Sequence, residues 1–149
     1  MQLVIRFGFG ADTPWVKRTE DGALLAIAGA SCGGSGSDAT GDVIVTMKDF
    51  SLAAEPGTFV AGTMSFGIQN DGPSAHEFVV IRSDEAADAL PVENGVIPED
   101  QIDLVDEAED IAPGTSTSLT VELEAGSYVL VCNLPAHYES GMHASFTVG

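Results

Sequence analysis

Basic residues are scarce in this sequence. Its 149 residues include 5 Lys and Arg against 23 Asp and Glu, which gives a formal net charge of -18 at pH 7. Such a chain would repel the phosphates of nucleic acids and anionic membrane surfaces, so both are excluded as binding partners. The same acidity suits either electrostatic steering toward a basic partner or solubility at high salt, and the composition favours neither.

Cysteine and tryptophan are also rare, with two cysteines and one tryptophan in the chain. Cys32 is expected to lie outside the folded domain, which disfavours a disulfide between Cys32 and Cys132. An immunoglobulin-type domain needs two strand cysteines and a core tryptophan, but the one tryptophan is Trp15, near the start of the chain. A structural zinc site needs four ligands, usually rich in thiolate or histidine, and a domain with one cysteine fits that poorly.

Long apolar runs are also missing. The run at residues 23–30 is far shorter than the roughly 18 residues needed to span a bilayer. A basic pair precedes it and small residues lead to Cys32, a pattern that indicates a lipoprotein signal with a lipid on Cys32. We therefore expect residues 1–32 to be a leader, with translation beginning near Val16. The alternative is a disordered leader with an incidental cysteine.

A folded domain is expected after this leader. Residues 33–41 are dominated by Gly and Ser and predict a flexible tether. The rest, residues 42–149, is long enough for one domain with its own core, and a hydrophobic content of 44% argues against a disordered chain.

Short strands separated by turn signals fill this domain. Residues 117–123 alternate, for example, with Leu119, Val121 and Leu123 directed inward. Residues 83–102 show no sustained period and predict a long connection with one helical turn. The pattern predicts an all-β, Greek-key β-sandwich of seven or eight strands. The expected strands are 43–45, 50–52, 62–70, 76–82, 105–111, 117–123, 128–132 and 142–148.

One loop between two apolar strands carries three residues that bind soft metals. Cys132, His137 and Met142 supply a thiolate, an imidazole and a thioether, a combination that selects copper. Such a site needs a second histidine, and His76, at the head of an apolar strand, is the candidate. Strand alternation should direct His143 away from Met142, so His143 is expected at the surface and remains only a minor rival. Each residue taken singly would be ordinary packing, but together they indicate a site.

In the order of these ligands the chain resembles the cupredoxins, the small blue-copper proteins. The segments that carry the resemblance are residues 74–78, 125–132 and 132–142, and it extends over roughly residues 41–149. Four residues separate Cys132 from His137, and four separate His137 from Met142, a spacing that most resembles the sulfocyanin, rusticyanin and plastocyanin-like branch. The resemblance implies a cupredoxin-like sandwich and one type 1 copper ion held by the side chains of His76, Cys132, His137 and Met142.

The surroundings of the ligands can be predicted in the same way. Glu77 stands where many cupredoxins have an asparagine, so Asn133 is expected to link the two ligand loops instead. Backbone amides after Cys132 should donate to its sulfur, and Gly141 should take an unusual backbone angle. An apolar rim around the edge of His137 is expected from residues 134–136 and Tyr138.

The resemblance implies an electron carrier rather than an enzyme. With two histidines committed, only His143 is left, which is too few for a second copper centre. The expected partner is a redox protein such as a cytochrome, oxidase or reductase with a basic docking face. The expected location is periplasmic or at the cell surface, as a monomer whose membrane association comes only through a lipid on Cys32. Copper delivery or storage is the alternative function. The acidic run 100–110 is read as a solvated face, with a loose calcium site as the rival reading.

Overall fold

The computed structural model of the chain describes residues 38–149. The predicted leader, its lipidation site Cys32 and most of the predicted tether lie outside the described residues and stay predictions. Within residues 38–149, no helix is both long enough and apolar enough to cross a membrane.

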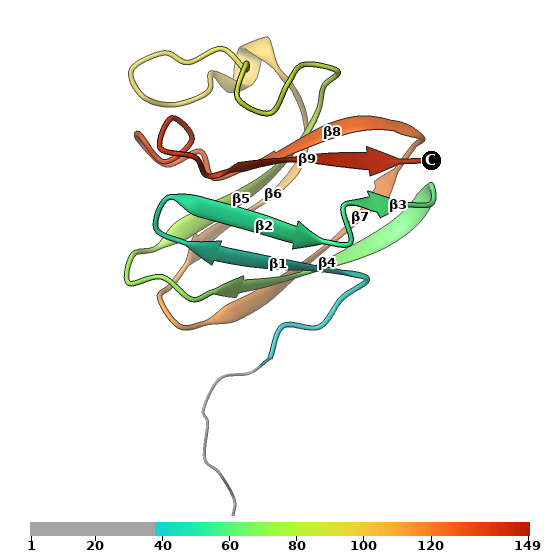
Figure 1. Cartoon of the computed structure of the whole chain (residues 1–149), viewed down its shortest axis with the longest axis horizontal. Helices are drawn as coiled ribbons and strands as arrows, with labels where there is room; N and C mark the ends of the chain where they lie inside the picture. The colour runs from blue at the N-terminus through green and yellow to red at the C-terminus, as the bar shows by residue number, and fades with distance from the viewer. Residues whose placement is uncertain (1–37) are drawn as a thin grey trace, which may run out of the picture. The chain divides into compact units, whose positions relative to one another are not determined.

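Two β-sheets form the domain (Figure 1). One sheet has four strands in the order β2-β1-β4-β7, and the other has five in the order β3-β9-β8-β5-β6. The pairs β1–β4 and β3–β9 are parallel and the remaining pairs are antiparallel. The strands are β1 (Val43–Lys48), β2 (Ser51–Glu55), β3 (Thr58–Phe59), β4 (Gly62–Asn70), β5 (His76–Arg82), β6 (Asp103–Ile111), β7 (Ser116–Leu123), β8 (Gly126–Val131) and β9 (His143–Val148).

The predicted all-β sandwich is therefore confirmed, with one strand more than expected. The additional strand is β3, whose two residues pair with Thr147 and Val148 of β9. Two residues are too few to show any alternation, and this pairing joins segments far apart in the chain. The sequence pattern could not reveal it.

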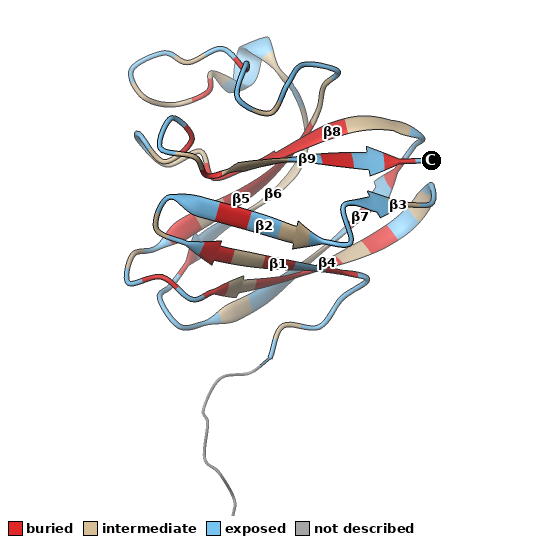
Figure 2. Cartoon of the chain, in the orientation of Figure 1, coloured by how far each residue is buried: buried red, intermediate tan, exposed pale blue. Residues whose placement is uncertain are grey.

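The core lies between the sheets and is centred on three phenylalanines. The ring of Phe66, in β4, lies 5.2 Å from that of Phe78, in β5, and 5.6 Å from that of Phe146, in β9, measured between centroids. All three side chains are almost fully buried. Figure 2 shows buried segments among partly buried and exposed ones on the strands of both sheets. These contacts fix β4 of one sheet against β5 and β9 of the other.

Strand β5 is apolar on both faces because both faces are covered. Phe78 and Val80 belong to the core between the sheets, whereas Val79 and Ile81 pack into a second apolar cluster on the outer face. The connection at residues 83–102 contributes Leu90 and Ile97 to that cluster, and the neighbouring strand β8 contributes Val129 and Val131. It includes the 3₁₀ turn η1 (Glu99–Gln101), the helical turn predicted from the sequence. In Figure 1 this connection lies beyond β8 and β9, on the side away from the four-stranded sheet.

Candidate metal centre

The connections β1–β2, β4–β5, β6–β7 and β8–β9 lie at one end of the sandwich, on the left in Figure 1. His76 is the first residue of β5, Cys132 directly follows β8, and His137 lies in the loop between β8 and β9. His76 and Cys132 are fully buried, whereas His137 is partly exposed. The sheets thus bring together side chains that are far apart in sequence.

Three potential ligand atoms form a compact triangle. Nδ1 of His76 lies 3.3 Å from Nδ1 of His137, and Sγ of Cys132 lies 3.4 Å from Nδ1 of His137 and 3.9 Å from Nδ1 of His76. The point equidistant from these three atoms is about 2 Å from each, close to typical metal–nitrogen and metal–sulfur bond lengths of about 2.0–2.3 Å. The donor set and its spacing therefore fit a trigonal His₂Cys site of the type 1 copper kind.

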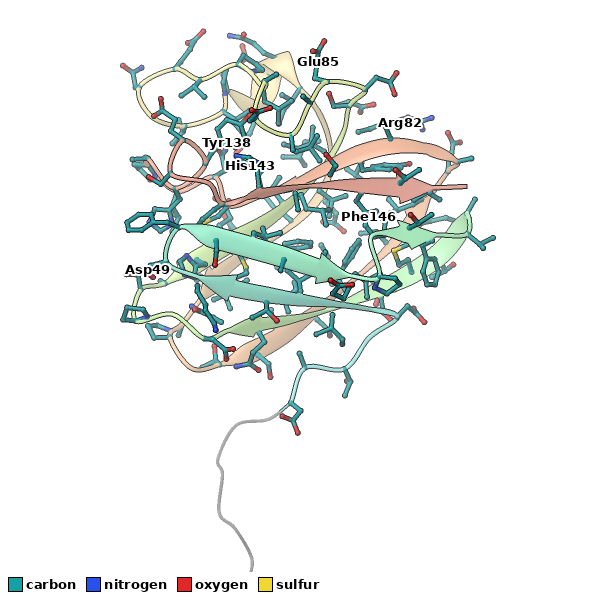
Figure 3. All side chains as sticks on the ribbon, in the orientation of Figure 1. Asp49, Arg82, Glu85, Tyr138, His143 and Phe146 are labelled. Atoms are coloured by element: carbon teal, nitrogen blue, oxygen red, sulfur yellow. The ribbon has the colours of Figure 1, made fainter. Side chains whose placement is uncertain are left out.

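Met142 closes the ligand loop beside Cys132. Its side chain is fully buried, and its carbonyl oxygen accepts a 3.0 Å hydrogen bond from the amide of Cys132. Gly141 has the unusual backbone angle expected of it, with φ at +110°. His143 lies outside the metal-binding group and packs its ring 5.3 Å from that of Tyr138 (Figure 3). It is partly rather than fully exposed.

The surroundings of Cys132 and His76 shift the pKa of each toward its neutral form. Burial raises the pKa of the Cys132 thiol, against hydrogen bonds from the amides of Glu77 and Leu134. Burial, followed by the neighbouring His137, lowers the pKa of His76, while Asp49 opposes both. A neutral imidazole is the form that binds a metal, whereas the thiol must lose its proton to do so.

The predicted link between the two ligand loops is made by a different group. The backbone N–H of Glu77, not the side chain of Asn133, reaches across to Sγ of Cys132 at 3.4 Å. A backbone amide serves whatever side chain it carries, so a glutamate at position 77 is compatible with this contact. The backbone amide of Leu134 also lowers the pKa of the Cys132 thiol, in keeping with the prediction for the residues after Cys132.

Asn133 instead ties the ligand loop to the connection at residues 83–102. Its Oδ1 accepts a 2.7 Å hydrogen bond from the amide of Ile97, and its Nδ2 donates to the Ile97 carbonyl at 3.1 Å. Nearby, the Ala136 amide donates to the carbonyl of Gly95 at 2.8 Å. We call these contacts, with those of Tyr138 described next, the loop brace.

Tyr138 was predicted in the exposed rim, and that prediction is wrong. The side chain is 3% exposed, and its hydroxyl accepts from the Leu90 amide at 2.9 Å and donates to the Ala87 carbonyl at 2.8 Å. Successive turns in the loop direct His137 toward Cys132 and Tyr138 toward the connection. The hydroxyl group of Tyr138 was the signal that the sequence interpretation missed. A buried tyrosine hydroxyl usually finds a hydrogen-bond partner, so this side chain could be expected to lie against the backbone of another segment.

Comparison with known proteins adds the fold family. No protein-family model matches the chain, and no curated protein matches it by sequence. The solved structures that are similar to it include two auracyanins and a rusticyanin. Dithionite-reduced auracyanin from Roseiflexus castenholzii is 23% identical, with a TM-score of 0.53, over 71% of this chain and 94% of that one. Auracyanin A, a blue copper protein from Chloroflexus aurantiacus, is 21% identical, with a TM-score of 0.51, over 71% and 99%. Rusticyanin from Thiobacillus ferrooxidans is 22% identical, with a TM-score of 0.52, over 72% and 75%.

The chain has the cupredoxin fold. The resemblance drawn from the ligand order is thus confirmed at the level of the fold, which auracyanins and rusticyanin share. The described residues of this domain place His76, Cys132 and His137 together, as the resemblance implies.

The partly exposed edge of His137 has an apolar surround. Pro135 and Ala136 are exposed, as predicted, and Leu134 is partly buried against the core. Phe50 is an additional member that the sequence did not reveal. It is 59% exposed, and its ring stands edge-on to that of His137 at 6.3 Å. A strand was expected at 50–52, but Phe50 has φ at +65° and belongs to the turn before β2.

Beside this site the domain carries a carboxylate cluster. Carboxylate oxygens of Glu77, Glu107 and Glu109 lie within 4.8 Å of one another. Burial, followed by Glu107 and Glu109, raises the pKa of Glu77 to about 7. Burial also raises the pKa of Glu107, followed by the charges of neighbouring acids. Mutual repulsion, rather than a solvated face alone, characterises this part of the acidic segment.

Replacing Glu107 with glutamine is expected to stabilise the domain at pH 7. A carboxyl whose pKa is raised on folding contributes its stability at low pH and loses it as pH rises through the folded-state pKa. The neutral amide removes that loss, with a gain of about 0.2–1 kcal/mol, typical of relieving a like-charge pair. Thermal melts between pH 4 and pH 8 would show a gain that vanishes at the acid end. Glu122→Gln, at an exposed position of β7, is the control, and an equal gain there would contradict the prediction.

Proposed function

We propose that this cupredoxin domain is a mononuclear type 1, blue copper protein that carries single electrons. The observation that supports the proposal is the triangle of Cys132 Sγ and two histidine Nδ1 atoms, with the buried Met142 adjoining it. Bound copper would supply one-electron chemistry by alternating between its Cu(I) and Cu(II) states. His76, Cys132 and His137 would hold it, with Met142 as the weak axial ligand.

The protein's contribution is a ligand geometry that changes little between the two states. His76 and Cys132 are attached to neighbouring strands of the five-stranded sheet, and strands hold side chains more firmly than loops do. The loop that carries His137 is held by its own turns, by the backbone bond from Cys132 to Met142, and by the loop brace. Amide donors to Cys132 Sγ would tune the potential by withdrawing charge from the sulfur.

Electrons would enter and leave at the edge of His137. Among the three triangle residues, His137 is the one with solvent access, and its surround of Phe50, Pro135 and Ala136 is exposed. An apolar contact surface can exclude water between two proteins without requiring paired charges. The bound partner would then lie within direct reach of a ligand.

The partner we propose is a redox protein, such as a cytochrome, oxidase or reductase, with a basic docking face. The net charge of -18 supports this, because opposite charge accelerates the encounter of two proteins. We propose a monomer in the periplasm or at the cell surface, anchored by a lipid if Cys32 is modified as the sequence predicts. A carrier rather than an enzyme is favoured because His143, the third of the chain's three histidines, stands apart from the triangle.

Visible absorption after adding one equivalent of Cu(II) to the purified protein tests the proposal. We expect an intense thiolate-to-copper band that a mild reductant bleaches reversibly. Cys132→Ser should lose the band completely, because serine cannot supply the thiolate on which it depends. His143→Ala, which removes an imidazole outside the triangle, should retain it.

Two other outcomes would count against electron transfer. Copper that binds without the band would favour delivery or storage, the alternative function. If the protein binds no copper at all, the proposal is wrong and the domain is a β-sandwich without a metal.

A further inference from the structure

The far side of His76 is paired with a carboxylate that the sequence did not indicate. Asp49, in the turn between β1 and β2, places its Oδ1 3.4 Å from Nε2 of His76. Both atoms are buried, and within residues 38–149 neither makes a hydrogen bond of good geometry, so the contact between them is the one polar contact found for each. The second oxygen, Oδ2, accepts a 2.9 Å hydrogen bond from the hydroxyl of Ser74. Figure 3 shows Asp49 at the end of the sandwich that carries the ligand loop.

The neighbouring loop leaves space for this pair. A Cβ atom on Gly72 would lie 2.8 Å from Oδ1 of Asp49 and 3.0 Å from Nε2 of His76, which is too close for either. The loop is held in place by Asn70, which is fully buried. Its Oδ1 accepts from the Gly72 amide at 2.9 Å, and its Nδ2 donates to the carbonyls of Ser74 and Ile111. The loop at Gly72, held by Asn70, therefore leaves room for Asp49 to approach His76 closely.

The direction of the imidazole explains why the carboxylate matters. Nδ1 of His76 faces Cys132 and His137, so Nδ1 must present a lone pair if a metal is to bind there. The proton of the neutral ring then belongs on Nε2, and a buried N–H needs an acceptor. Oδ1 of Asp49 is the acceptor within reach. Carboxylates that bond to the outer nitrogen of a ligating histidine fix both its tautomer and its orientation.

We propose that Asp49 is a positioning residue of the metal centre, which holds His76 with its proton on Nε2 and Nδ1 free to bind. Its negative charge, on the side of the ring opposite the metal, also favours the more positive Cu(II) state and so lowers the reduction potential. The effect on the potential rests on the proposed copper function. The tautomer does not, because it is a property of the metal-free protein.

Two readouts on the full chain separate these effects. Nitrogen-15 NMR of the histidine rings in metal-free protein should show His76 protonated on Nε2. Asp49→Ala removes the acceptor, so we expect a mixture of tautomers and a copper affinity weaker by about 10–100-fold. Asp49→Asn keeps an oxygen acceptor but no charge, so it should retain the tautomer while raising the reduction potential. Asp71→Asn makes the same charge change at an exposed position in the loop before β5 and should do neither.

Each result decides a part of the proposal. If Asp49→Ala keeps the Nε2 tautomer and its copper affinity stays within about threefold of the wild type, Asp49 does not position His76. If Asp49→Asn and Asp71→Asn raise the potential equally, the charge of Asp49 has no special effect. If Asp49→Ala fails to fold, Ser74→Ala replaces it, because losing the hydrogen bond to Oδ2 should change the tautomer in the same direction to a smaller extent. A shifted tautomer in a protein that binds no copper would refute the proposed function while retaining the role of Asp49.

Discussion

Replacing Phe66 with alanine is expected to lower the free energy of unfolding by about 3–5 kcal/mol. Phe66 is fully buried and touches one ring on β5 and another on β9, so its removal leaves a cavity between the two sheets. Close-packed sheets cannot collapse into such a space without losing other contacts. The melting temperature should fall by roughly 10 °C or more, as measured by circular dichroism on the metal-free protein.

The same variant should leave the copper spectrum of the folded fraction unchanged. Phe66 belongs to the core cluster, and its two aromatic contacts are with Phe78 and Phe146, neither of which is a ligand. Thr63→Ala, at an exposed position on the same strand, is the matched control and should change stability by no more than about 0.5 kcal/mol. A Phe66→Ala protein as stable as Thr63→Ala would contradict the packing described for the core.

Much of this core could be predicted because alternation and turn residues are local signals. Strands β4 and β5 were predicted with the bounds that the structure has. The errors lie where a distant partner decides the conformation. Strand β3 exists through its pairing with β9, and β6 begins earlier than expected because Asp103 pairs with Arg82 of β5.

The ligands were predictable for a different reason. Cys132, His137 and Met142 lie in one loop, so their spacing is visible in the sequence, and the small number of histidines left His76 as the partner. Asp49 gives no such signal. A single aspartate in a turn is ordinary in an acidic chain, and its contact with His76 depends on how β1 and β5 are placed in different sheets.

The two supports of the site are thus both non-local. The turn before β2 holds His76 through Asp49, whereas the connection at residues 83–102 holds the loop that carries His137. They act on different ligands, Asp49 on His76 and the connection on the loop of His137. Because the Nδ1 atoms of these two ligands lie 3.3 Å apart, the effects of variants in the two supports need not be additive.

Replacing Asn133 with alanine tests the second support and should have a large effect on the ligand loop. The change leaves the N–H and C=O of Ile97 without their partners, and Ile97 is 1% exposed. Each unpaired buried backbone group costs about 1–3 kcal/mol, so we expect a total loss of about 2–4 kcal/mol. The loop itself should loosen most. Hydrogen exchange at the amides of His137, Gly141 and Met142, which close its turns, should accelerate more than exchange in β4.

Gln101→Ala is the control for this variant, because Gln101 bonds to Glu93 on the exposed side of the same connection. It should leave both stability and loop exchange near wild-type values, since exposed hydrogen bonds contribute little. Copper should leave Asn133→Ala faster, by about tenfold, if the loop brace holds His137 in place for binding. Equal release rates in the two variants would show instead that the connection only covers the outer face of the sheet, and that the turns of the loop are sufficient to fix its ligand.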